Sequence, residues 1–190
     1  MKKIASTGLI LSAFLVGMAS CNQENGAVEE AQETNEMMAD DTAMEDEMED
    51  MSEFMTKAAS GGMMEVELGK LAQEKGASQD VKNFGQMMVT DHTSANDKLK
   101  QLAMQKNIVL PDSMGEKHME HVNELREKSG AEFDKAYMEL MVNDHQEDVD
   151  LFQKAADNMQ DADVKSFASS TVTVLQQHLD RAKQIHEGLK

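Results

Sequence analysis

The 190-residue sequence has few of the residues on which β-rich and disulfide-linked proteins depend. It contains one proline, one cysteine, one tyrosine and no tryptophan, and only 4% of its residues are aromatic. A lone cysteine has no partner within the chain for a disulfide. What the sequence has instead is much Met, Ala, Leu, Lys, Glu and Gln, a composition that favours helices over strands. The composition therefore predicts an all-α fold.

Basic residues are also scarce, with 18 Lys and Arg against 36 Asp and Glu, for a formal net charge of -18. This charge argues against nucleic acid as a partner, because a phosphate backbone binds basic surfaces. Much of the acid lies between Asn22 and Glu53, where there are 13 acidic residues and no Lys or Arg. We therefore expect residues 22–52 to form an acidic, disordered tether. A chain that starts at Glu53 should then be as stable as one that starts at Asn22.

Residues 1–21 resemble a bacterial lipoprotein signal peptide. Two lysines precede an apolar run at 4–16 that is too short for an ordinary membrane span, and small residues then lead to Cys21. The resemblance implies that Cys21 is lipidated and anchors the protein to a membrane of the cell envelope. Because Asn22 is not the Asp that often retains such proteins at the inner membrane, the outer membrane is favoured. The alternative is an ordinary secretory signal with an incidental cysteine.

Apolar residues at helical spacing predict a helical domain at 53–190. Four long helices are expected at 53–74, with Ser52 as N-cap, and at 79–106, 129–157 and 161–188. Pro111 breaks the chain between the second and third, and Ser113 with Glu116 predicts a short helix at 113–128. Short connections within each pair of long helices and a long link between the pairs favour a ferritin-like four-helix bundle.

The apolar stripe of each long helix carries one titratable residue: Glu65, His92, His145 or His178. Counting from the turns at 1.5 Å per residue places all of them near mid-height, in one layer of the core. Each histidine could be a core residue with its own hydrogen-bond partner, and the layer could be one network or share one ion. Imidazole and carboxylate together suit a divalent Zn, Cu, Fe or Ni ion. Asp91 and Asp144 precede two of the histidines and are expected to support the ligands from outside.

Four segments resemble a bacterial family of proteins with a domain of unknown function, numbered 4142. They read MEVELGKLA at 64–72, MVTDHTSAN at 88–96, SGAEFDKAYMELMVNDHQEDVDLF at 129–152 and QHLDRAKQI at 177–185. The resemblance covers about 54–185 and implies an exported, ferritin-like protein, often labelled a predicted outer-membrane protein. It implies no established activity.

Three kinds of function remain open. The chain lacks the Glu-x-x-His pairs of di-iron bundles, a nucleophile with a neighbouring base and a Gly-rich phosphate loop, so a redox enzyme ranks third. The first hypothesis is an envelope lipoprotein that binds a metal ion and acts in metal handling or envelope stress. The second is a structural or interaction module whose polar layer fixes the helix register. His118 and His121 are a weaker candidate pair at the surface, and a homo-oligomer is left open.

Overall fold

The computed structural model describes residues 26–39 and 45–189, which form six helices. They are α1 (Ala27–Ala39), α2 (Glu45–Lys75), α3 (Gln79–Lys106), α4 (Glu116–Arg126), α5 (Gly130–Asn158) and α6 (Ala162–Gly188). No strand occurs among the described residues, so the all-α prediction is confirmed. The expected signal peptide and Cys21 lie outside the described residues. None of the described helices is both long and apolar enough to cross a membrane.

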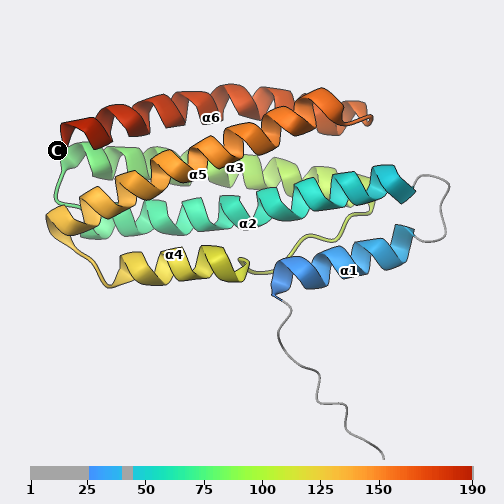
Figure 1. Cartoon of the computed structure of the whole chain (residues 1–190), viewed down its shortest axis with the longest axis horizontal. Helices are drawn as coiled ribbons and strands as arrows, with labels where there is room; N and C mark the ends of the chain where they lie inside the picture. Colours follow the sequence, from blue (N-terminus) through green and yellow to red (C-terminus); the bar gives the residue numbers. More distant parts are fainter. Residues whose placement is uncertain (1–25, 40–44, 190) are drawn as a thin grey trace, which may run out of the picture.

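The long helices pair as two hairpins, α2 with α3 and α5 with α6 (Figure 1). The hairpins pack through α2 against α5 and through α3 against α6. The link between them runs back along the bundle and includes α4, which lies against α2, so α3 and α5 point the same way (Figure 1). A helical bundle with one long crossover is therefore present, and the ferritin-like topology stays a prediction.

The expected disordered tether is wrong for 27–39 and 45–52, which are helical. The inner face of α1 consists of small or polar residues at a spacing of four, Ala31, Asn35 and Ala39, and α1 packs along α2. The Nδ2 of Asn35 donates to Ser52 Oγ at 2.8 Å and to the Val109 carbonyl oxygen at 2.9 Å, and its Oδ1 accepts from the Val109 N–H at 2.7 Å. Ser52, the expected N-cap, lies buried inside α2.

The short helix also begins later than its capping signal predicts. Gly115, not Ser113, holds the N-cap of α4, and the Ser113 hydroxyl donates to Asp112 instead. The Gly115 N–H donates to Ser60 Oγ at 2.9 Å, so α4 starts where α2 offers it an acceptor. A local capping pattern cannot reveal such a partner, because the two residues are 55 positions apart.

The core divides into two apolar clusters along the bundle. One includes Phe54, Leu99, Phe152 and Leu175, and the other includes Leu68, Met88, Met141 and Ala182. Four buried polar residues, Glu65, His92, His145 and His178, lie where the two clusters meet along the long helices. Beside the second cluster, α2 and α3 approach each other closely, since a Cβ on Gly85 would lie 2.7 Å from the Gly69 carbonyl oxygen. Only glycine allows the two helices to approach this closely.

Candidate metal centre

Four buried polar side chains meet at one level of the bundle, one from each long helix. Glu65 comes from α2, His92 from α3, His145 from α5 and His178 from α6, and none is more than 6% exposed. The centroids of the three imidazole rings are 5.3, 5.5 and 5.7 Å apart. One ring nitrogen of each lies within 4.8 Å of the other two. The side chains lie together as the helical spacing predicts, and their metal-binding role stays a prediction.

Each histidine uses one ring nitrogen for a contact with an oxygen atom. The pairs are His92 Nδ1 with Glu65 Oε2 at 2.5 Å, His145 Nδ1 with the Met141 carbonyl oxygen at 3.0 Å, and His178 Nε2 with Asp91 Oδ2 at 2.9 Å. Because these oxygens accept, each neutral ring carries its hydrogen on the nitrogen that faces the oxygen. The opposite nitrogens, His92 Nε2, His145 Nε2 and His178 Nδ1, are buried without a hydrogen-bond partner. Three lone pairs are therefore available in one layer.

Glu65 contacts two of the histidines through different oxygens. Its Oε2 accepts from His92, whereas its Oε1 lies 3.3 Å from His145 Nε2 without the geometry of a hydrogen bond. When the carboxyl is ionised, two lone pairs face each other across that distance in the buried layer. A buried acceptor without a donor costs about 1–3 kcal/mol. Either a cation beside both atoms or a proton on Glu65 removes this cost.

Burial keeps the three histidines neutral. Burial is the largest cause of the lowered pKa of each ring. It lowers the pKa of His92 to about 4, although the charges of Asp144 and Asp91 act in the opposite direction. Burial and the neighbouring His92 and His178 hold the pKa of His145 well below its usual value. Burial also lowers the pKa of His178 against the effect of its hydrogen bond to Asp91. Neutral imidazole is the form that binds metal ions, and near neutral pH all three rings are in this form.

The two aspartates that precede histidines take different positions. Asp91 accepts a hydrogen bond from the His178 ring across the α3–α6 contact, and the supporting role expected for it stays a prediction. Asp144 instead offers a carboxylate oxygen within 4.8 Å of ligand atoms of Glu65 and His145. Its Oδ2 is buried without a hydrogen-bond partner. Asp144 therefore lies where it is a potential ligand as well as the supporting residue that the sequence predicts.

Sequence reasoning missed Asp148 and Tyr137. Asp148 follows Asp144 by one helical turn on the same face of α5, and this i, i+4 spacing was the available signal. Burial, the charge of Glu65 and a hydrogen bond with Glu65 raise the pKa of Asp148 well above its usual value. The Tyr137 hydroxyl is buried without a partner. Burial, then the charges of Glu65 and Asp144, raise its pKa, but its place on an apolar stripe gives no sign of these neighbours.

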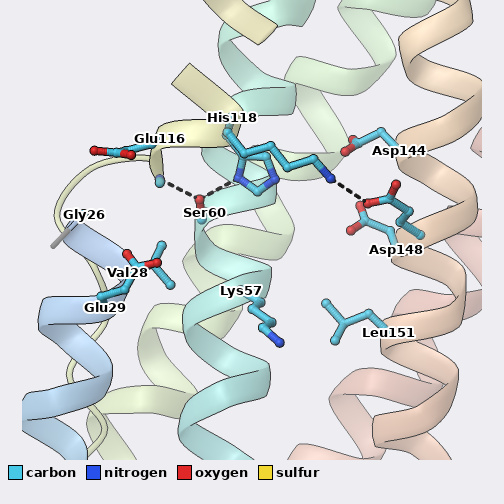
Figure 2. A pocket seen from close by; sticks show the side chains of 13 residues that line it. Gly26, Val28, Glu29, Lys57, Ser60, Glu116, His118, Asp144, Asp148 and Leu151 are labelled. Carbon is cyan, nitrogen blue, oxygen red and sulfur yellow. Dashed lines mark hydrogen bonds and ion pairs between the residues drawn. The ribbon is translucent and has the colours of Figure 1, made fainter. Parts of the chain in front are cut away.

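A pocket of about 630 Å³, open to solvent, lies between α1, α2, α4 and α5 (Figure 2). Asp144 and Asp148 line it from α5 and face the start of α4 (Figure 2). A much smaller cavity of about 20 Å³ lies deeper, with Glu65, His92 and Asp148 in its wall. Asp148 borders both spaces, so it separates the polar layer from the pocket.

The pair His118 and His121 does not form a comparable site. His118 Nδ1 lies 2.6 Å from Ser60 Oγ, which already accepts from Gly115, so this histidine helps to fix α4 on α2 (Figure 2). Across residues 26–39 and 45–189, no group of three potential ligands includes either histidine. The weaker surface candidate therefore has no third ligand.

Fold and site together define a helical-bundle protein with a candidate metal centre in its core. Its sequence places it in one family: the model for the Domain of unknown function (DUF4142) matches residues 33–185, so the chain belongs to the DUF4142 family. The match contains the whole polar layer and extends into α1. Comparison with curated proteins and with solved structures gave no match. Because membership names no activity, any functional conclusion rests on the site itself.

Proposed function

We propose that the protein binds one divalent transition-metal ion at mid-bundle, through His92, His145, His178 and Glu65. The observation that carries the proposal is the set of three buried ring nitrogens without partners, each opposite a nitrogen bound to an oxygen. Metal-binding histidines usually donate their second ring N–H to a carboxylate or carbonyl oxygen in this way. Three imidazoles and a carboxylate suit Zn²⁺, Cu²⁺, Fe²⁺ or Ni²⁺.

The role proposed for the ion is metal handling in the cell envelope, with Cys21 as the lipid anchor. The resemblance of residues 1–21 to a lipoprotein signal supports the anchor and the outer membrane as its place. Burial of all four ligands supports retention of an ion over turnover of a substrate, because a catalytic ion keeps an open position for its substrate.

Zn²⁺ binding by the full chain, produced without a histidine tag, tests the proposal. Equilibrium dialysis should recover about one ion per chain, as expected for one four-ligand site. Zn²⁺ at about a hundredfold excess over Kd should stabilise the fold by about 2.7 kcal/mol and raise Tm. His145→Ala should abolish both effects, and His121→Ala on α4 should keep both. Zn²⁺ that binds and stabilises His145→Ala as it does the wild type would overturn the proposal.

The second candidate is a hydrogen-bond network in which a proton takes the place of the ion. Burial raises the pKa of Glu65 well above its usual value, and a protonated carboxyl could donate to His145 Nε2. The layer would then fix the register of the helices without metal. In that case His145→Ala still destabilises the protein, but Zn²⁺ does not raise the Tm of the wild type.

A further inference from the structure

A second set of potential ligands, rich in oxygen, lies beside the histidines on the side of the pocket. Glu65, Asp144 and His145 each offer one atom, and these atoms lie within 4.8 Å of one another. His145 has only Nε2 free, since its Nδ1 is bound to the Met141 carbonyl oxygen. One nitrogen lone pair serves one ion, so when His145 binds with the other histidines, Asp144 remains available for another ion and Glu65 lies between the two.

The carboxyl groups of Glu65, Asp144 and Asp148 gather without a basic side chain to neutralise them. No ion pair within the described ranges joins any of them to Lys or Arg. The two lysines that line the pocket pair with other carboxylates. Buried carboxylates are normally paired with a charge or bind a metal ion. Glu65 is buried and the two aspartates beside it are half-buried, and no cationic side chain in the described part of the chain pairs with them.

Three polar atoms in or beside these carboxyl groups are buried and have no hydrogen-bond partner. They are Oε1 of Glu65, which is 1% exposed, Oδ2 of Asp144 and the hydroxyl of the fully buried Tyr137. Native proteins rarely leave buried polar atoms unsatisfied, and an ion or water between them is a common explanation. Three such atoms in one neighbourhood are therefore an observation independent of the number of acidic residues.

A route from solvent reaches this group. Asp144 and Asp148 line the open pocket of about 630 Å³ (Figure 2). Asp148 also borders the inner cavity of about 20 Å³ beside Glu65 and His92. A space of this size can hold one water or ion. Ions from solvent can therefore reach Asp144 and Asp148 through the pocket.

We propose that Glu65, Asp144 and Asp148 hold a second divalent cation, next to the histidine-bound ion and reached from the pocket. The inference rests on the proposed function, because it assigns His145 to the first ion. Oxygen ligands select a hard cation of the Mn²⁺ or Mg²⁺ class, whereas the imidazoles select a softer transition metal. The centre is then asymmetric, with Glu65 between its two positions.

The test uses full-length protein loaded with one equivalent of Zn²⁺ and then titrated with Mn²⁺, with free Mn²⁺ measured by electron paramagnetic resonance. The wild type should bind about one Mn²⁺ per chain while it keeps its Zn²⁺, because the two positions prefer different ligands. The double variant Asp144→Asn/Asp148→Asn should retain Zn²⁺ and lose Mn²⁺ binding. The control Glu139→Gln/Asp150→Asn removes two exposed carboxylates from the same helix and should bind Mn²⁺ as the wild type does.

The outcomes separate this inference from the proposed function. Zn²⁺-loaded wild type that takes up no Mn²⁺, or a double Asn variant that binds Mn²⁺ like the wild type, would overturn the second position and leave the first standing. Wild type that fails to bind Zn²⁺ would overturn the proposed function and this inference with it.

Discussion

His178 illustrates how one hydrogen bond fixes which ring nitrogen stays free. Its Nε2 donates to Asp91 Oδ2 at 2.9 Å, which leaves the lone pair on Nδ1. Asp91→Ala removes this support without removing a ligand, so Zn²⁺ affinity should fall about 10–100-fold at unchanged stoichiometry. Competition with a chelator measures the change, and Asp97→Ala, exposed on the same helix, is the control. Equal affinities of Asp91→Ala and wild type would show that the bond does not orient the ring.

The buried ionisable groups also predict how the stability of the metal-free protein varies with pH. The folded pKa of His92 is about 4 against an ordinary 6.5, so the unfolded chain takes up its proton first as pH falls through this window. Stability contributed by His92 is therefore lost between pH 6.5 and about 4. Asp144 and Asp148 act in the opposite direction, because their raised pKa values make the folded state bind protons first.

Removing the two aspartates should therefore expose the effect of the histidines. Metal-free Asp144→Asn/Asp148→Asn should lose more unfolding free energy between pH 7 and pH 5 than metal-free wild type, as measured by urea denaturation. The variant Glu139→Gln/Asp150→Asn should follow the wild type. A pH dependence shared by all three proteins would contradict the opposing contributions.

The four residues of the polar layer were predictable from sequence, whereas the place of Asp144 and Asp148 next to Glu65 was not. Glu65 and the three histidines lie on apolar stripes, and helical spacing alone turns such residues toward the core. Asp144 and Asp148 lie beside the stripe of α5, and they enter the site only because α2 and α4 pack against that side. Side chains off the main stripe acquire neighbours from tertiary packing, which spacing does not report.

Among the elements, α1 departs most from what the sequence predicts. Its composition is acidic and its buried face is small, so the hydrophobic pattern there is weak. What holds it is a set of hydrogen bonds from Asn35 to Ser52 and to Val109, which is 74 residues away in sequence. Partners at that separation leave no periodic signal. The start of the family match at residue 33, inside α1, agrees with a folded unit that begins before Glu53.

The contribution of α1 can be measured at Asn35. Asn35→Ala leaves the Val109 N–H without its acceptor and removes both donor bonds, which should lower the unfolding free energy by about 2–3 kcal/mol. Met37→Ala, at a position that is 72% exposed on the same helix, should change it little. A chain that starts at Glu53 should also be less stable, contrary to the expectation for a tether. Denaturant unfolding that is unchanged by Asn35→Ala would show that α1 does not depend on this anchor.

At the scale of the whole molecule, the polar layer joins all four long helices where the apolar core is divided. Apolar clusters lie on both sides of the layer, and the α2–α3 and α5–α6 hairpins contribute two of its members each. Helix lengths and the long crossover were predictable because periodicity and connection length constrain them. An ion bound in the layer would connect the two hairpins and stabilise their packing.

Anomalous diffraction from crystals of the Zn²⁺-loaded protein, collected at the zinc absorption edge, tests the central claim most directly. The account predicts a zinc peak inside the polar layer, about 2.0–2.1 Å from His92 Nε2, His145 Nε2 and His178 Nδ1. A zinc peak beside His118, or a layer without zinc in protein that has bound an equivalent elsewhere, would contradict it.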